Sequence, residues 1–146
     1  MKMKKLICVM ALVCIGMLLV SCGSKCLGDP KAQLMRDFGL NIDKKDCVLE
    51  ELFNNYEGFP YEGMALYKLT VGEDVRQAFL QWERFPLSEE AEHFLESLSA
   101  YAELPSIADG YWKMVDRNPG TSAYTNVSLC VYDRATGAAY LLTMDI

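Results

Sequence analysis

The sequence predicts an α+β fold, an antiparallel sheet packed against helices, and two observations carry this prediction. The first is a series of apolar stretches in the C-terminal third, separated by short turns. The second is a pair of segments in the middle of the chain whose apolar residues recur at helical spacing. Residues 22–146 are long enough for one hydrophobic core, so we expect a single domain.

Three strands are predicted in the C-terminal third, at residues 110–117, 125–133 and 138–146. Pairing Asp133 with Ala138 gives the last two strands one wholly apolar face. The pairs on that face are Val131–Tyr140, Leu129–Leu142 and Val127–Met144. The opposite face is mixed and carries Ser128, Thr143, Asn126 and Asp145 beside Cys130 and Leu141. A slip by one residue would turn the apolar side chains outward, so the sequence predicts a three-strand meander in this register.

Two central helices are predicted, at residues 73–83 and 88–101. The first carries an apolar stripe made of Val75, Ala78, Phe79 and Trp82. Ser88 caps the second helix. Its stripe consists of Ala91, Phe94, Leu95, Leu98 and Tyr101. We expect both helices to pack on one face of the sheet, the apolar one.

The segment before these helices contains one more helix and at least one more strand. Asp29 and Pro30 are a typical helix start, and Gly39 can end that helix after Phe38. Residues 64–71 predict a strand that places Ala65, Tyr67, Leu69 and Val71 on one face. Residues 46–53 fit a helix or a strand, and the Asn-, Gly- and Pro-rich residues 54–63 predict a loop.

The N-terminus is typical of an export signal. Three lysines precede an apolar run at residues 6–20, which as a helix would span roughly 22 Å, short of a bilayer core of about 30 Å. The run ends in Leu19-Val20-Ser21-Cys22, which resembles the lipobox of bacterial lipoproteins. The resemblance implies cleavage before Cys22 and two or three acyl chains (palmitate among them) on that cysteine. The alternative is a plain secretory signal in which Cys22 falls at the cleavage site by chance.

The lipobox sets the predicted organisation: a signal peptide at residues 1–21, a tether at 22–28 and a globular domain at 29–146. Three Lys leave with the signal and all 20 acidic residues stay, so the remainder has 11 Lys+Arg and a formal charge of −9. Anionic lipid would repel such a domain, whereas two or more acyl chains anchor it stably. We therefore expect a lipid-anchored protein on the extracytoplasmic face of the cell membrane.

Three cysteines remain once the signal is removed and Cys22 is acylated. A disulfide between Cys26 and Cys47 would join the tether to the domain. The alternative is three reduced thiols, with Cys130 packed as a small apolar residue inside a strand.

The C-terminal third also resembles a group of small bacterial lipoproteins. The matching segments are residues 110–117, 126–137 and 140–145. This resemblance implies that residues 48–51 form a strand leading into a loop. It implies no activity, and where the relatives carry His and Asp in that loop this chain has Tyr56, Pro60, Tyr61 and Glu62.

Little in the sequence indicates catalysis. The net negative charge excludes a nucleic-acid binder that relies on basic charge, and the chain has no phosphate-binding loop or nucleophile elbow. His93 is the only histidine. With Glu89 and Glu96 it shares a helix face, which is better explained as a solvated charged surface than as a metal site. We expect no metal and no cofactor.

Aromatic residues are the remaining lead. The candidate binding patch comprises Tyr56, Phe59, Tyr61, Tyr111 and Trp112, although Tyr111 and Trp112 alternate faces and one of them should be buried. Two hypotheses follow. The preferred one is a non-enzymatic envelope module that binds a protein, peptide or glycan. The alternative is a small envelope hydrolase that uses His93 as its base.

Overall fold

The computed structural model describes residues 29–146 except for 44–45, 58–61, 102 and 121–124. The signal peptide, the tether, Cys22, Cys26, Phe59 and Tyr61 therefore lie outside the described residues. Within these described residues the structure has three helices and a six-stranded antiparallel sheet, so the α+β prediction is confirmed. The helices are α2 (Pro30–Phe38), α3 (Glu73–Phe79) and α4 (Glu89–Leu98). The strands are β1 (Val48–Asn54), β2 (Gly63–Thr70), β3 (Glu83–Arg84), β4 (Gly110–Asp116), β5 (Asn126–Asp133) and β6 (Ala138–Asp145).

Helix α2 begins and ends where its sequence predicts. The Asp29 carboxylate accepts the N–H of Lys31 at 3.0 Å, and Pro30 occupies the first turn, where a missing N–H costs nothing. Gly39 ends the helix at a φ of 71°, a left-handed conformation that glycine adopts without a steric penalty.

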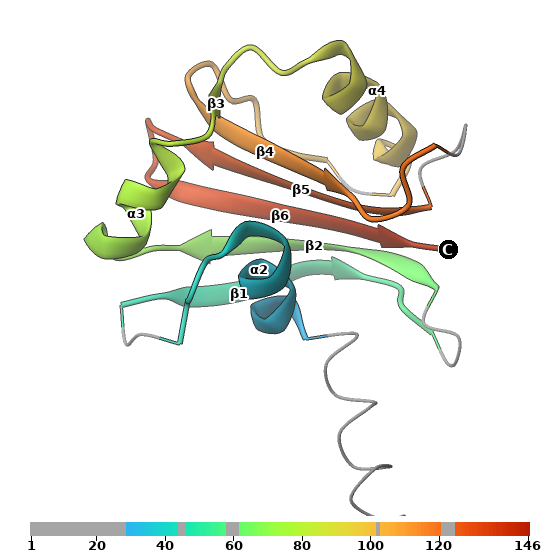
Figure 1. The fold of residues 1–146 in the computed structure, drawn as a ribbon, viewed down its shortest axis with the longest axis horizontal. Helices are drawn as coiled ribbons and strands as arrows, with labels where there is room; N and C mark the ends of the chain where they lie inside the picture. The colour runs from blue at the N-terminus through green and yellow to red at the C-terminus, as the bar shows by residue number, and fades with distance from the viewer. Residues whose placement is uncertain (1–28, 44–45, 58–61, 102, 121–124) are drawn as a thin grey trace, which may run out of the picture.

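The strands lie in the order β1-β2-β6-β5-β4-β3, so the C-terminal strand β6 runs through the middle of the sheet (Figure 1). Strands β5 and β6 pair in the predicted register, with Val131 opposite Tyr140 and Leu129 opposite Leu142. Residues 48–51, which the resemblance assigned to a strand, belong to β1 at the edge of the sheet.

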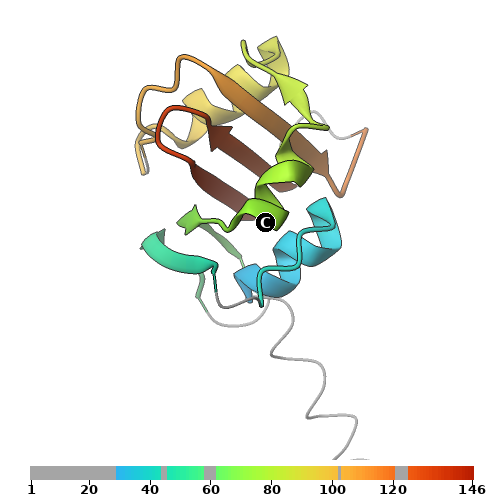
Figure 2. The same cartoon turned by 90° about the vertical axis from the view of Figure 1, so that its left-hand side faces the viewer.

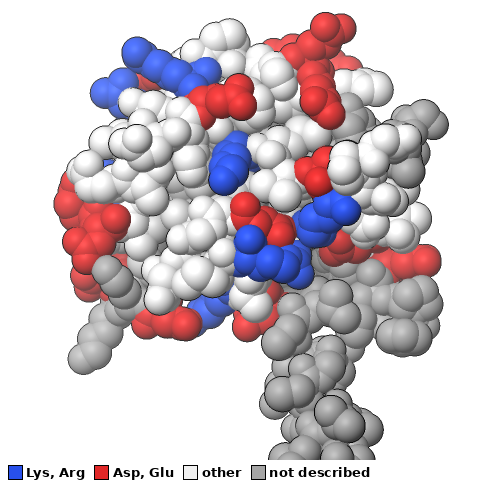
Figure 3. All heavy atoms as spheres, in the orientation of Figure 1, with Lys and Arg blue, Asp and Glu red and all other residues white. Residues whose placement is uncertain are grey.

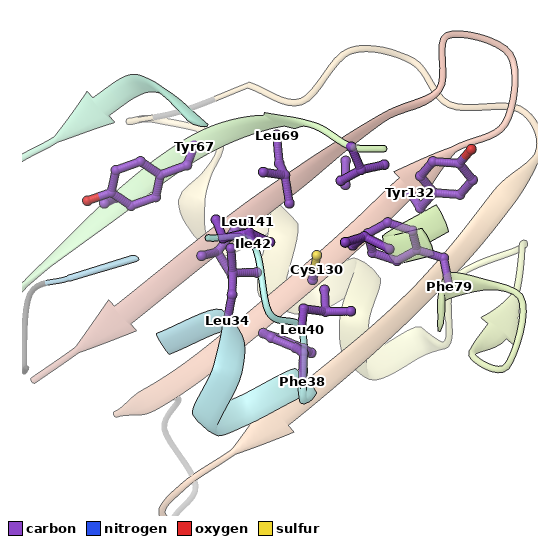
Figure 4. Close-up of a cluster of buried hydrophobic side chains, with 14 residues drawn as sticks. Leu34, Phe38, Leu40, Ile42, Tyr67, Leu69, Phe79, Cys130, Tyr132 and Leu141 are labelled. Atoms are coloured by element: carbon purple, nitrogen blue, oxygen red, sulfur yellow. The ribbon is translucent and has the colours of Figure 1, made fainter. Parts of the chain in front are cut away.

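The two central helices cover opposite faces of the sheet, so the prediction that both pack on one face was wrong (Figure 2). Helices α2 and α3 cover one face and α4 covers the other. The first core contains Leu34, Phe38, Val75 and Phe79 from the helices and Tyr67, Leu69, Cys130, Tyr132 and Leu141 from the strands (Figure 4). The second contains Ala91, Phe94 and Leu98 from α4 and Leu66, Trp112, Leu129, Val131, Tyr140 and Leu142 from the strands. Strands β5 and β6 are therefore buried on both sides.

Both central helices are shorter than predicted. Helix α3 ends at Phe79, because the chain must turn back to lay β3 beside β4. Trp82 follows in that turn, and its ring packs edge-on against Phe79 with centroids 4.8 Å apart. Helix α4 ends at Leu98, so Tyr101 leaves the predicted stripe and is exposed. None of the helices in the described part of the chain combines the length and apolar character needed to cross a membrane.

Candidate functional site

The aromatic residues predicted to form one binding patch are not brought together in the described structure. Trp112 is 4% exposed and belongs to the core under α4. Tyr111, its neighbour on β4, packs against the core under α2 and α3. Tyr56 is half-buried on that side as well, where its hydroxyl donates to an oxygen of Asp145 at 2.8 Å. The described members of the patch thus lie on two sides of the sheet.

His93 and its glutamates lie on the exposed face of α4, as expected for a charged surface. They border an open hollow of about 670 Å³ lined by Ser88, Glu89, Glu90, Glu92, His93 and Glu96. The hydroxyl oxygen of Ser88 is occupied as the helix cap, since it accepts the N–H of Ala91 at 3.2 Å.

A second, smaller hollow of about 320 Å³ adjoins the first and is the strongest candidate for a functional site. We call it the acidic pocket. Its lining residues are Glu83, Ser88, Glu90, Trp112, Met114 and Asp116. Ser88 and Glu90 line both hollows, so the two form one continuous acidic surface beside α4.

The strand register explains why the side chains of the acidic pocket meet. Trp112, Met114 and Asp116 are alternate residues of β4, so they project from the same face. Glu83 of β3 lies directly opposite Trp112 in the ladder and joins that face. Helix α4 starts over this corner of the sheet and adds Glu90 from its first turn.

The acidic pocket is strongly negative. Within the described chain, neither Lys nor Arg lines either hollow. Arg84 follows Glu83 but pairs with Tyr111 on the opposite face, where its guanidinium binds Asp109 at 3.4 Å. Acidic side chains gather at the upper right of the molecule, over α4 (Figure 3).

Trp112 has one polar atom without a hydrogen-bond partner. Its indole Nε1 is buried and finds no hydrogen-bond acceptor in the structure. A buried donor without a partner costs roughly 1–3 kcal/mol, so such groups are uncommon in folded proteins.

A second group of polar side chains, which we call the Asp37 cluster, holds α2 against the sheet. Its members are Arg36, Asp37, Tyr56, Arg117, Ser128, Thr143 and Asp145. The guanidinium of Arg117 donates to Asp37 at 2.7 Å and also binds Asp145. The hydroxyl of Ser128 donates to Asp37 at 2.8 Å. Ser128 and Thr143 are fully buried, so the Asp37 cluster is a structural joint rather than a surface for ligands.

The surroundings of Asp37 hold its carboxylate in the charged form. Burial alone would raise the pKa of Asp37. Hydrogen bonds from Arg36 and Ser128, together with the charge of Arg117, outweigh burial and keep that pKa below its ordinary value. Burial raises the pKa of the Tyr56 phenol, which remains a neutral donor to Asp145. Burial likewise raises the pKa of the Cys130 thiol, which is fully buried among apolar side chains.

We expect the Asp37 cluster to make the free energy of unfolding depend on pH in the acidic range. A carboxylate whose pKa is lower in the folded state stabilises the fold above its unfolded pKa of about 3.9. That stabilisation is lost as the pH falls through the lower, folded-state pKa. Asp37→Asn should therefore lower the free energy of unfolding by about 2 kcal/mol at pH 7 and flatten its decline below about pH 4.

Urea denaturation of the full-length protein in nonionic detergent, repeated from pH 7 to pH 2, measures both effects. The matched control is Asp43→Asn, because Asp43 pairs with Lys31 at 3.3 Å on the open surface and should change stability by less than about 1 kcal/mol. Parallel acid curves for the wild-type and Asp37→Asn proteins would contradict the assignment.

The predicted disulfide stays a prediction, since Cys26 lies outside the described residues and Cys47 is half-buried beside the core under α2 and α3. Among the described residues, no three His, Cys, Asp or Glu side chains are arranged to hold a metal ion. Comparisons with protein-family models, curated protein sequences and solved structures found no match to the chain.

Proposed function

We propose that the protein is a lipid-anchored binding module of the cell envelope, without enzymatic activity. In this proposal acyl chains on Cys22 hold it at the extracytoplasmic face of the membrane. Residues 29–146 act as one domain, whose C-terminal meander carries the binding surface. The observation that supports binding most directly is the convergence of three carboxylates around the buried indole of Trp112 in the acidic pocket.

The position of Asp29, the first described residue, supports the same proposal. The chain enters the described structure at Asp29, at the start of α2, on the face of the sheet away from α4 (Figures 1 and 2). The acidic surface beside α4 thus lies on the opposite side of the sheet from Asp29, where the described chain begins. An anionic membrane would repel this surface and favour an orientation in which it points outward.

A crosslinking experiment in cells tests the binding role. We replace Glu89, which lines the larger hollow adjoining the acidic pocket, with p-benzoylphenylalanine in the full-length protein and irradiate intact cells. Gln77, an exposed residue of α3 on the opposite side of the sheet, is the matched control position. We expect a discrete adduct from position 89 and none from position 77, with the adduct weakened by Asp116→Asn. Identical adducts from both positions, or none from position 89, would refute the binding role.

The same cells test the anchor. Grown with a clickable fatty acid, they should label the protein, and Cys22→Ser should abolish the label. Equal labelling of the wild-type and Cys22→Ser proteins would refute the anchor without touching the binding role.

A further inference from the structure

We infer that an extended segment of a partner protein adds a strand to the sheet along residues 113–116 of β4, with a basic side chain opposite Asp116. We call these four residues the open edge. The inference rests on the proposed binding role and names the kind of segment that is bound. It follows from the backbone groups at the open edge, the space beside them and the charge around them.

Strand β3 covers only the first part of β4. Its two residues pair with Tyr111 and Trp112, whereas β4 pairs with β5 along its whole length (Figure 1). The chain before β3 cannot lengthen it, because that chain is folded into a turn in which Trp82 donates its N–H to the carbonyl of Phe79 at 3.0 Å. Among the described residues, no strand therefore lies beside the open edge.

The register of β4 shows which backbone groups face outward. Arg117, directly after β4, donates its N–H to β5 at 2.8 Å, whereas the carbonyl of Gly110 accepts an N–H from the chain that follows β3 at 3.1 Å. Hydrogen bonds of an antiparallel strand alternate between its two neighbours, so the N–H and C=O of Met114 and Asp116 point to the β3 side. The described chain gives these four groups no backbone partner. The β4–β5 ladder has no register shift, so the open edge is regular enough to pair with another strand.

The acidic pocket offers room for the side chains of an added strand. Met114 and Asp116 line the pocket and are half-buried. Residues directly opposite each other in an antiparallel pair lie on the same face of the sheet, so the partners of Met114 and Asp116 would enter the pocket. Its volume of about 320 Å³ suits the side chains of a short segment.

Charge excludes a second copy and favours a basic segment. Two open edges side by side would bring Glu83 and Asp116 of one molecule against the same carboxylates of the other. The β1 edge of another copy carries Glu50 and Glu51 and would also be repelled. All pairs in this sheet are antiparallel, which is the more stable arrangement per residue. The fitting segment therefore carries Arg or Lys opposite Asp116 and, two residues later, an apolar residue opposite Met114.

Amide hydrogen exchange, measured by NMR on the full-length protein in nonionic detergent, tests this inference. The probe is the peptide acetyl-Thr-Arg-Thr-Val-Thr-amide. In the free protein, the amides of Met114 and Asp116 should exchange about tenfold faster or more than those of Lys113 and Val115, which bond to β5. The peptide at ten times its Kd should slow exchange of Met114 and Asp116 about tenfold and leave the other two unchanged.

Two N-methylated peptides separate strand pairing from attraction between charges, because both keep the arginine. Methyl groups on the Arg and Val nitrogens replace the two N–H groups that face β4. They should weaken binding about tenfold or more, as expected for two lost hydrogen bonds. A methyl group on the central Thr nitrogen, whose N–H points away from β4, should leave the peptide bound.

Variants of the protein test the basic residue. Asp116→Asn should weaken binding of the unmethylated peptide about threefold, as expected for one cross-strand charge pair. Glu50→Gln removes a charge from β1, at the other edge of the sheet, and should leave the affinity unchanged.

Three results would overturn the inference. The first is slow exchange of Met114 and Asp116 in the free protein, which would show a covered edge or, if it disappears on dilution, a second copy as the occupant. The second is equal binding of the two methylated peptides, and the third is an equal loss of affinity in Glu50→Gln. If the peptide fails and position 89 still crosslinks in cells, the binding role stands and only strand addition is wrong. If the peptide binds and no adduct forms, strand addition stands and the proposed role in the envelope fails.

Discussion

Phe79→Ala and Phe94→Ala should each lower the free energy of unfolding by about 4 kcal/mol. Both side chains are fully buried, but they lie on opposite faces of the sheet. Phe79 stacks on Tyr132 with ring centroids 4.6 Å apart and meets Trp82 edge-on. Phe94 joins α4 to the core that contains Trp112. Each substitution leaves a cavity that the surrounding sheet cannot close.

Urea denaturation followed by far-ultraviolet circular dichroism measures both losses in the full-length protein. Leu80→Ala is the control for α3 and Glu92→Ala the control for α4. Both side chains are exposed, and each change should cost less than about 1 kcal/mol. A cost for Phe94→Ala no larger than that of Glu92→Ala would show that α4 does not contribute a second core. The acidic pocket would then lack a stable wall.

Gly110→Ala should lower the free energy of unfolding by about 3 kcal/mol or more, although it adds only one methyl group. A Cβ at this position would lie 2.0 Å from the carbonyl oxygen of Tyr132 and 3.1 Å from its carbon. Both atoms belong to the backbone of β5, so neither can rotate away. Gly110 also pairs with Asp133 in the ladder, and its own carbonyl accepts the N–H of Phe85 at 3.1 Å. The methyl group must therefore push β4 away from β5.

The same denaturation experiment checks this prediction, with Gly39→Ala as the control. Gly39 has a positive φ of 71°, and a Cβ added there would meet no atom within 4 Å. Alanine at this position therefore carries only the conformational penalty, about 1–2 kcal/mol. Equal costs at the two positions would refute the steric argument.

The β5–β6 register follows from the sequence, because only one pairing gives a continuous apolar face. The burial of the other face of β5 and β6 is less evident from the sequence. Ser128 and Thr143 are polar, and the alternation along the strands predicts a mixed surface for their face. In the structure both are fully buried, since Asp37, Arg117 and Tyr56 supply hydrogen-bond partners from distant parts of the chain. Those partnerships depend on tertiary contacts, so helical spacing alone could not place α3 and α4 on different faces.

The acidic pocket was only partly predictable. Alternation along β4 correctly separates Trp112 from Tyr111, and it also aligns Met114 and Asp116 with Trp112. The missing part was Glu83, which the spacing of apolar residues placed at the end of a helix. A two-residue strand has no periodicity of its own, and β3 exists only because it pairs with β4. The only signal of this pocket in the sequence was the alternation along β4, which places Asp116 on the same face of the strand as Trp112.

Strand β1 determines whether neighbouring molecules of this protein associate edge to edge when they are crowded together. It forms an edge of the sheet and exposes Val48 and Leu52, which would favour sheet-to-sheet pairing between neighbouring molecules. Its regular ladder is interrupted between Glu51 and Phe53, and Glu50 and Glu51 add negative charge beside that interruption. Two such edges meeting side by side would repel each other and fail to align. Molecules concentrated on a surface would thus remain separate instead of assembling into extended sheets.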